Sequence, residues 1–217
     1  PLVTGPLPHG WTPLLLVCLL QRGETDTRKD QKGAQTMRAT LDKLISWTGL
    51  LLAVVLLVAG GLLTWASSFA GSQVHDQLAM QDITMPAKAQ LETKDQHAAL
   101  DQYAGQKMTT GAQAKAFADH YILVHMNAAG GGKTYEEVSG QYIQLSDAEK
   151  ASPDGQKLAG LRQTLFMGNT LRGELLTAYA FGKLGVIAGY AAIASFVGAG
   201  LLFILGGFGL VHAKRAR

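Results

Sequence analysis

The chain has 217 residues, of which 47% are hydrophobic and only 16% are charged, and its formal net charge is +3. The small basic surplus is not gathered into one patch with interleaved aromatic residues, so we expect no nucleic-acid partner. The single cysteine, Cys18, excludes a disulfide framework within the chain and a zinc site built from cysteines.

The first 36 residues differ in character from the rest. Their apolar run, Leu14 to Leu20, is too short to span a bilayer, and it lacks the flanking features of a signal peptide. We interpret residues 1–36 as upstream sequence read in front of a natural start at Met37. A disordered cytoplasmic tail is the alternative.

Two long apolar blocks follow. Residues 44–66 and 184–211 contain no Lys, Arg, Asp or Glu. A helix needs about 20 consecutive apolar residues to cross the hydrocarbon core of a bilayer, and both blocks meet that length. We therefore predict two transmembrane helices that contact the lipid bilayer.

Basic residues lie on one side of these predicted spans. Arg38 and Lys43, within a short N-terminal segment of residues 37–43, precede the first span, and a basic tail at 212–217 follows the second. Short basic flanks stay in the cytoplasm. The sequence predicts a plasma-membrane protein with both termini in the cytoplasm and residues 67–183 outside.

Small residues recur along both predicted spans. They are Gly49, Ala53 and Gly60 in the first span and Gly185, Gly189 and Ala192 in the second. Such residues let helix backbones approach closely, as in the GxxxG motif that begins at Gly185. Two interpretations stay open: the spans pack on each other as a hairpin, or the GxxxG motif contacts a second copy or another membrane protein.

The connecting segment carries helix signals. Thr110 to Gln113 and Thr134 to Glu137 read as capping boxes, and Ser152 before Pro153 reads as an N-cap with proline in the first turn. Together with the spans, these signals predict an all-α fold. It consists of two transmembrane helices flanking a small, mainly helical extracytoplasmic domain.

Other positions predict where these helices end. Residues 127–132 are expected to stop one helix through their glycines, and Gly168-Asn169 to break or kink another. Residues 67–80 look like an outward continuation of the first span. Residues 81–105 are compatible with loop or short helix.

In the stretch AAGGGKTYEEVS, residues 128–139, the glycine run is followed by Lys133 and Thr134, as at the end of a phosphate-binding P-loop. That motif needs a glycine where Asn127 stands, and the segment is predicted to face the outside. We therefore expect no nucleotide binding and read Thr134 as a helix cap. Gly140 weakens the helix that follows, so residues 141–145 could instead form a short strand.

The weak candidates for a metal site are Asp119, His120 and His125, with His75 from another helix. A non-haem iron site needs two histidines and a carboxylate on one side of the metal. Five residues along an α-helix rotate by about 140°, so His120 and His125 would not share a face. We assign no catalytic residue and no cofactor, and we favour a non-enzymatic protein.

Several stretches resemble a family of actinobacterial membrane proteins with two spans and an outer domain. They are WTGLLLAVVLLVAGGLLTWASSFAGSQVHDQL, YAGQKMTTGAQAKAFADHYILVHM, GGGKTYEEVS and QTLFMGNTLRGELLTAYAFG, within a resemblance that covers about residues 37–217. Some members carry the label "aromatic ring-opening dioxygenase LigA". The label implies a metal-dependent enzyme, but the residues here do not form the metal cradle that such chemistry needs.

These observations lead to a ranked set of functional hypotheses. The first is an accessory or structural component of a membrane or envelope complex. The second is an extracytoplasmic sensing or ligand-binding domain that works through a partner. The third is the ring-opening dioxygenase that the label suggests.

Overall fold

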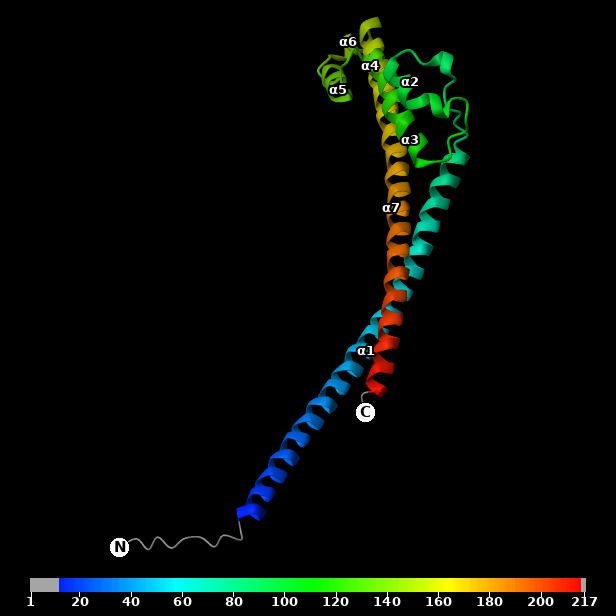
Figure 1. Cartoon of the computed structure of the whole chain (residues 1–217). Coiled ribbons are helices and arrows are strands. Elements are labelled where there is room, and N and C mark those ends of the chain that lie inside the picture. The colour runs from blue at the N-terminus through cyan, green and yellow to red at the C-terminus, as the bar shows by residue number, and fades with distance from the viewer. Residues whose placement is uncertain (1–11, 216–217) are drawn as a thin grey trace, which may run out of the picture. The chain divides into compact units, whose positions relative to one another are not determined.

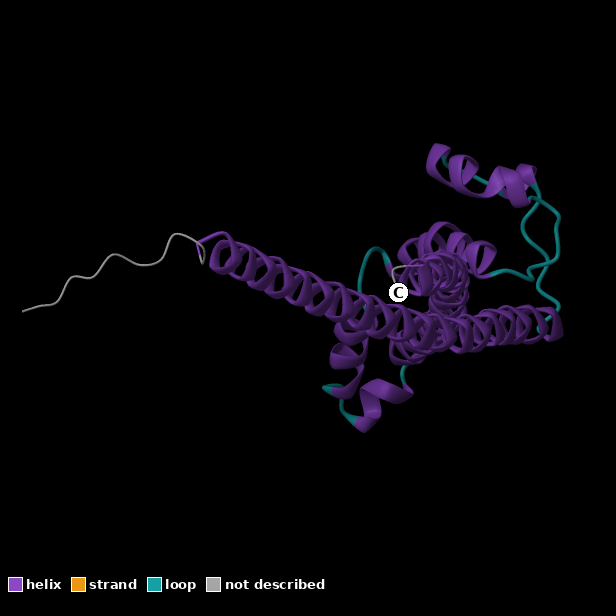
Figure 2. Ribbon diagram, turned by 60° about the horizontal axis from the view of Figure 1, so that its bottom comes forward, coloured by secondary structure: helices purple, strands orange, loops and turns teal. Residues whose placement is uncertain are grey.

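The computed structural model describes residues 12–215, with the side chains of residues 37, 38 and 40–215. Two long helices, α1 (Thr12–Met80) and α7 (Pro153–Arg215), are joined by a series of short ones (Figure 1). The short helices are α2 (Lys94–Leu100), α3 (Gly111–Phe117), the π-helix η3 (Ala118–Ile122), α4 (Leu123–Gly130), α5 (Tyr135–Ile143) and α6 (Asp147–Ala151). Within the described residues there is no strand, as Figure 2 also shows, so the all-α prediction is confirmed.

Helices α1 and α7 contain the two predicted spans, and both are long and apolar enough to cross a membrane. Helix α1 continues past residue 66 to Met80, as predicted. Of the predicted upstream segment, residues 1–11 lie outside the described residues, and the remainder belongs to α1. The chain divides into two compact units, residues 60–193 and residues 1–59 with 194–217.

The predicted capping boxes both form. At the start of α3, Thr110 Oγ1 accepts a hydrogen bond from the Gln113 backbone N–H at 3.3 Å, and Gln113 Oε1 accepts from the Thr110 N–H at 3.0 Å. Thr134 and Glu137 exchange the same two bonds at the start of α5. Because each box satisfies two backbone donors, the local sequence sets where these helices begin.

Two further capping boxes were missed by the sequence prediction. Thr93 with Gln96 starts α2, and Ser146 with Glu149 starts α6. Both follow the same spacing of three residues, which was therefore the available signal.

The glycine stop after α4 is confirmed. Gly131 and Gly132 have φ angles of 58° and 79°, in the left-handed region that residues other than glycine rarely adopt. The strand alternative for residues 141–145 is wrong, because α5 extends to Ile143. Between α1 and α3 the chain forms loops and short helices, including 3₁₀ turns at Lys88–Gln90 and Asp101–Tyr103.

The predicted helix break at Gly168-Asn169 is wrong, because α7 continues without interruption from Pro153 to Arg215. Gly168 serves packing instead. A Cβ atom added there would lie 2.5 Å from Sδ of Met126 in α4, so the missing side chain makes room for that neighbour. Sequence alone does not distinguish a glycine that ends a helix from one that admits a neighbour.

The core of residues 60–193 is built from large apolar side chains. Helix α1 supplies Val74 and Leu78, and α7 supplies Leu165 and Leu175. The short helices and loops add Met85, Leu91, Leu100, Met108, Ile122, Met126 and Val138. The short helices that contribute to this core are therefore held by burial rather than by their own length, whereas α6 has no buried residue.

Candidate functional site

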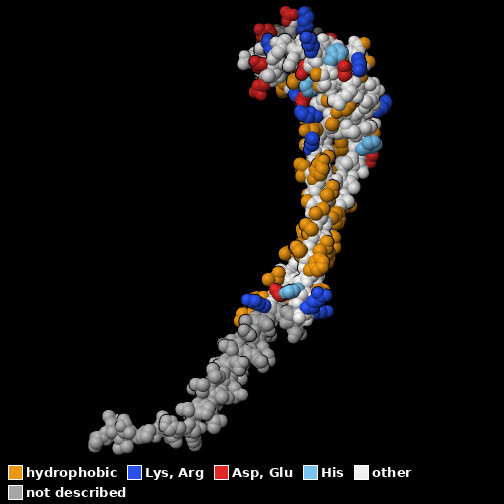
Figure 3. Space-filling model, viewed as in Figure 1, with side chains coloured by type: hydrophobic (Ala, Val, Ile, Leu, Met, Phe, Trp, Pro, Cys, Tyr) orange, Lys and Arg blue, Asp and Glu red, His pale blue; other side chains and the backbone are white. Residues whose placement is uncertain are grey.

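The surface of the two predicted spans is covered with large apolar side chains, visible in orange in Figure 3. Exposed positions include Trp47, Leu51 and Val58 in α1 and Ile193, Leu201 and Phe208 in α7. The buried positions of the same stretches hold small residues, such as Ser46, Ala53, Ala192 and Ala199. Large residues outside and small ones inside invert the pattern of a water-soluble helix.

The predicted GxxxG motif contacts α1 of the same chain. A Cβ atom added at Gly185 would lie 3.2 Å from Cβ of Ala70, and one at Gly189 would lie 3.0 Å from Oγ of Ser67. The hairpin interpretation therefore describes this motif. A contact with a second copy or another protein stays a prediction.

The other four predicted packing residues differ among themselves. Ala53, Gly60 and Ala192 are buried. Gly49 is not at a close contact, because a Cβ atom added there would meet nothing within 4 Å.

Three packing glycines were missed by the sequence analysis: Gly198, Gly206 and Gly209. A Cβ atom added at Gly206 would lie 3.0 Å from Cγ of Leu50, and one at Gly209 would collide with the Ser46 hydroxyl. The run Gly-Gly-x-Gly at residues 206–209 was the signal that could have found Gly206 and Gly209.

The predicted metal candidates are not brought together. His75 contacts Asp76 at 3.1 Å, His120 contacts Asp95 at 2.7 Å, and His125 contacts the backbone oxygen of Tyr121 at 2.7 Å. Among the residues with described side chains, no cluster of three or more His, Cys, Asp or Glu could hold a metal ion. Each of these three histidines therefore contacts a different partner.

Asp119, the fourth candidate, is paired with two cationic side chains. Its Oδ1 accepts a hydrogen bond from Arg172 Nη2 at 3.2 Å, and its Oδ2 accepts one from Lys115 Nζ. The hydrogen bond from Lys115 and that from Arg172 hold the pKa of the Asp119 carboxyl below its usual value, against the opposing effect of desolvation. Through these two hydrogen bonds, the Asp119 carboxylate of η3 links Lys115 of α3 to Arg172 of α7.

Arg172 also stabilises the π-helix η3. Its Nε donates to the backbone oxygen of Ala118 at 3.0 Å. The same oxygen accepts the backbone hydrogen bond from the Leu123 N–H, five residues later, so Arg172 adds a second donor to it from another helix. The sequence analysis missed this contact, because Arg172 is 54 residues away from Ala118.

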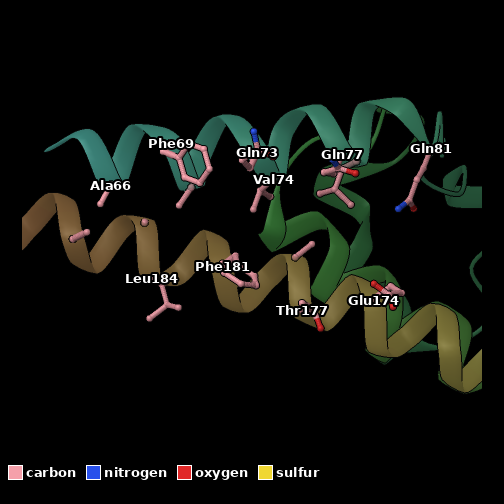
Figure 4. A pocket seen from close by; sticks show the side chains of 15 residues that line it. Ala66, Phe69, Gln73, Val74, Gln77, Gln81, Glu174, Thr177, Phe181 and Leu184 are labelled. Carbon is pink, nitrogen blue, oxygen red and sulfur yellow. The ribbon is translucent and has the colours of Figure 1, made fainter. Parts of the chain in front are cut away.

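An apolar groove of about 640 Å³ lies between residues 66–81 of α1 and residues 174–188 of α7. Figure 4 shows its side chains in two rows, from Ala66 to Gln81 on α1 and from Leu184 to Glu174 on α7. The composition changes along the groove: one end has Ala, Phe and Leu, and the other has Gln, Thr and Glu. Sequence analysis missed the groove, since its two rows are about 100 residues apart in the chain.

A smaller, polar pocket of about 380 Å³ lies between α5 and α7. The Arg162 guanidinium lies 5.4 Å above the Tyr142 ring centre, and its Nε donates to Ser139 Oγ at 3.0 Å. Hydrogen bonds from Ser139 and Arg162 lower the pKa of the Tyr135 hydroxyl. Among the described carboxylates, none lies within ion-pair distance of Arg162.

Comparisons with protein-family models, with curated proteins and with solved structures found no match to this chain. The family resemblance of the quoted stretches stays a prediction.

Proposed function

We propose that this chain is an integral membrane protein that acts as an accessory or structural component of a membrane or envelope complex. The observation that carries the proposal is the inverted pattern of α1 and α7, with large apolar side chains exposed and small ones buried. In water, this exposed apolar surface would be strongly unfavourable. Lipid acyl chains would cover it at no such cost.

The spacing of aromatic residues supports a bilayer around these helices. Trp47 and Trp65 on α1 are 64% and 66% exposed. They are 18 residues apart. A helical rise over that length is about 27 Å, close to the roughly 30 Å hydrocarbon thickness at whose borders Trp and Tyr concentrate.

The orientation follows from the basic flanks. Arg38 and Lys43 precede the apolar stretch of α1, and Lys214 and Arg215 end α7. With these residues in the cytoplasm, residues 67–183 form a domain outside the plasma membrane, tethered at both of its ends. Tethering raises the effective concentration of a weak contact near the membrane, which suits an accessory subunit.

Co-purification tests the proposed role. The full chain, tagged at its C-terminus, is extracted from native membranes with a mild detergent, and its companions are identified by mass spectrometry. We expect the chain in the membrane fraction with a companion in fixed stoichiometry. A chain that purifies alone would contradict the accessory role, and a chain in the soluble fraction would contradict the membrane location.

A second candidate function, ligand binding by the outer domain, is favoured by the polar pocket at Arg162. A half-buried guanidinium beside two tyrosine rings suits a small carboxylate. Titration with acetate and succinate, against chloride at equal ionic strength, should raise the melting temperature of the wild type and not that of Arg162→Gln. Equal shifts in the two proteins would exclude this pocket as the binding site.

A further inference from the structure

We propose that a second groove, between residues 42–49 of α1 and residues 202–212 of α7, binds one phospholipid of the cytoplasmic leaflet that carries a net negative charge. The groove has a volume of about 460 Å³ and lies within the unit that contains residues 1–59 and 194–217. The inference rests on the proposed membrane location and orientation. It goes further by assigning a binding site and a class of ligand.

The second groove lies at the inner border of the proposed bilayer, which Trp47 marks. A Cβ atom added at Gly206 would lie 3.2 Å from the Ser46 backbone oxygen and 3.0 Å from Cγ of Leu50, so this part of α7 is level with Trp47. Asp42, at the other end of the groove, is five residues before Trp47, a rise of about 7.5 Å. Because a headgroup layer is about 5–7.5 Å thick, the groove extends from the headgroups into the hydrocarbon.

Apolar residues line the part of the second groove that faces the bilayer interior. Leu202 and Leu205 line it from α7, with Ile45 and Phe208 at the border. The last three of these side chains are 65%, 70% and 70% exposed. Gly49 lines the groove from α1, and a Cβ atom added there would meet nothing within 4 Å, so the space beside it is open. This lining suits the acyl part of a lipid.

The other end of the second groove is polar and has basic neighbours. Asp42, Ser46 and His212 line it. Lys43 is three residues before Ser46 and Arg215 is three residues after His212, so each shares a helix face with a groove residue. Figure 3 shows Lys and Arg side chains gathered at this end of the apolar stretches. Among the described side chains, neither Lys43 nor Arg215 forms an ion pair, so both charges are available to a lipid phosphate.

The charge balance favours an anionic lipid over a zwitterionic one. The flanking segments 37–43 and 212–217 contain five Lys or Arg residues and one acidic residue, Asp42. Each basic residue at the membrane surface attracts anionic lipid, and the single carboxylate opposes them. A free phosphate ion would gain the same charge contacts without the apolar ones. The two ends of the groove together therefore select a lipid.

The first pair of variants is Gly49→Phe and Gly61→Phe. Both glycines lie in the apolar stretch of α1, and a Cβ atom added at either position meets nothing within 4 Å. Gly49 lines the second groove and Gly61 does not, so a phenyl ring fills the groove in the first variant alone. Gly61→Phe is the control for the added ring.

The second set of variants changes charge. Lys43→Gln and Arg215→Gln each remove one cation beside the groove, and Asp42→Asn removes the opposing carboxylate. The control is Lys183→Gln, which removes the same charge at the start of the apolar stretch of α7, far along the chain from this groove.

The experiment measures lipid binding to the purified full chain in micelles of a neutral detergent by native mass spectrometry. The probes are phosphatidylglycerol and phosphatidylcholine with identical acyl chains. We expect one bound phosphatidylglycerol on the wild type and on Gly61→Phe, and binding weaker by about fivefold or more in Gly49→Phe. Lys43→Gln and Arg215→Gln should each weaken phosphatidylglycerol binding by about fivefold, and Asp42→Asn should strengthen it. Phosphatidylcholine should bind more weakly than phosphatidylglycerol to the wild type.

Three results would overturn the inference. The first is equal phosphatidylglycerol binding by Gly49→Phe and the wild type. The second is a loss in Lys183→Gln as large as that in Lys43→Gln, because binding would then follow net charge and not this site. The third is equal binding of the two lipids by the wild type. The micelle experiment needs no companion protein, so failure of the lipid site and failure of the accessory role are read separately.

Discussion

The two regions of this protein bury residues of opposite size. In residues 60–193 the most deeply buried side chains are large, including Leu78, Leu100 and Leu165. In the stretch formed by residues 40–59 and 194–215, the buried positions hold Ser46, Ala53 and Ala199, and large apolar side chains are exposed.

This difference separates two driving forces. The first region gains stability by removing large apolar surfaces from water. In the proposed bilayer, the second gains it from close approach of two helix backbones, because lipid is as apolar as leucine and does not drive large side chains inward. Helices α1 and α7 run through both regions, and a different driving force packs them in each.

The largest effect that tests this contrast is expected from two leucine truncations on α7. Leu165 is 1% exposed and Leu201 is 57% exposed. Leu165→Ala should lower the free energy of unfolding by about 2–5 kcal/mol, because it leaves a cavity. Leu201→Ala should change it by about 0.5 kcal/mol or less. Denaturant unfolding in detergent micelles measures both, and equal losses would refute the contrast.

The next effect concerns the helix seam. Gly206→Ala places a methyl group 3.0 Å from Cγ of Leu50 and 3.2 Å from the Ser46 backbone oxygen, so the two helices must move apart by a few tenths of an ångström. We expect a loss of about 1–3 kcal/mol in thermal or denaturant unfolding. Gly49→Ala meets no atom within 4 Å and should be neutral or stabilising by up to about 1 kcal/mol. Identical behaviour of the two variants would show that the seam does not depend on close approach.

Within residues 60–193, the polar contacts of Arg172 should contribute less to stability than the apolar core. Arg172→Ala removes the hydrogen bonds to the Ala118 oxygen and the Asp119 carboxylate. Its expected cost is about 1–3 kcal/mol. Arg172→Lys keeps the charge without the planar fork and should restore only part of the loss. Full recovery by lysine would mean that charge alone, and not the contact with η3, matters.

The smallest effect is a pH dependence. Since Lys115 and Arg172 lower the pKa of Asp119 in the folded protein, this group stabilises the fold above the unfolded-state pKa of about 3.9. The contribution is lost as the pH falls through the lower, folded-state pKa. Unfolding measured between pH 7 and pH 3 should show a shallower acid loss in Asp119→Asn. An unchanged slope would contradict this role, while Glu137 and Glu149, whose pKa values are also lowered, account for residual acid sensitivity.

Sequence reasoning succeeded where the cause was local. Capping boxes at Thr110 and Thr134 and the stop at Gly131 depend on residues three or four positions apart. The apolar stretches of α1 and α7 follow from composition over some 20 residues. The missed boxes at Thr93 and Ser146 were accessible to the same reasoning.

Tertiary contacts decided the rest. Gly168 leaves room for the Met126 side chain, and Arg172 donates a hydrogen bond to η3. The groove between residues 66–81 and 174–188 is lined by one row of side chains from each long helix. None of these follows from a local pattern, because each depends on which residues a distant segment places nearby. The sequence by itself determined two long apolar helices and the starts of the short ones, since hydrogen bonds and helical periodicity act over a few residues. Only the tertiary structure decided which glycines admit a neighbour and where a groove stays open, since packing joins residues that are far apart in the chain.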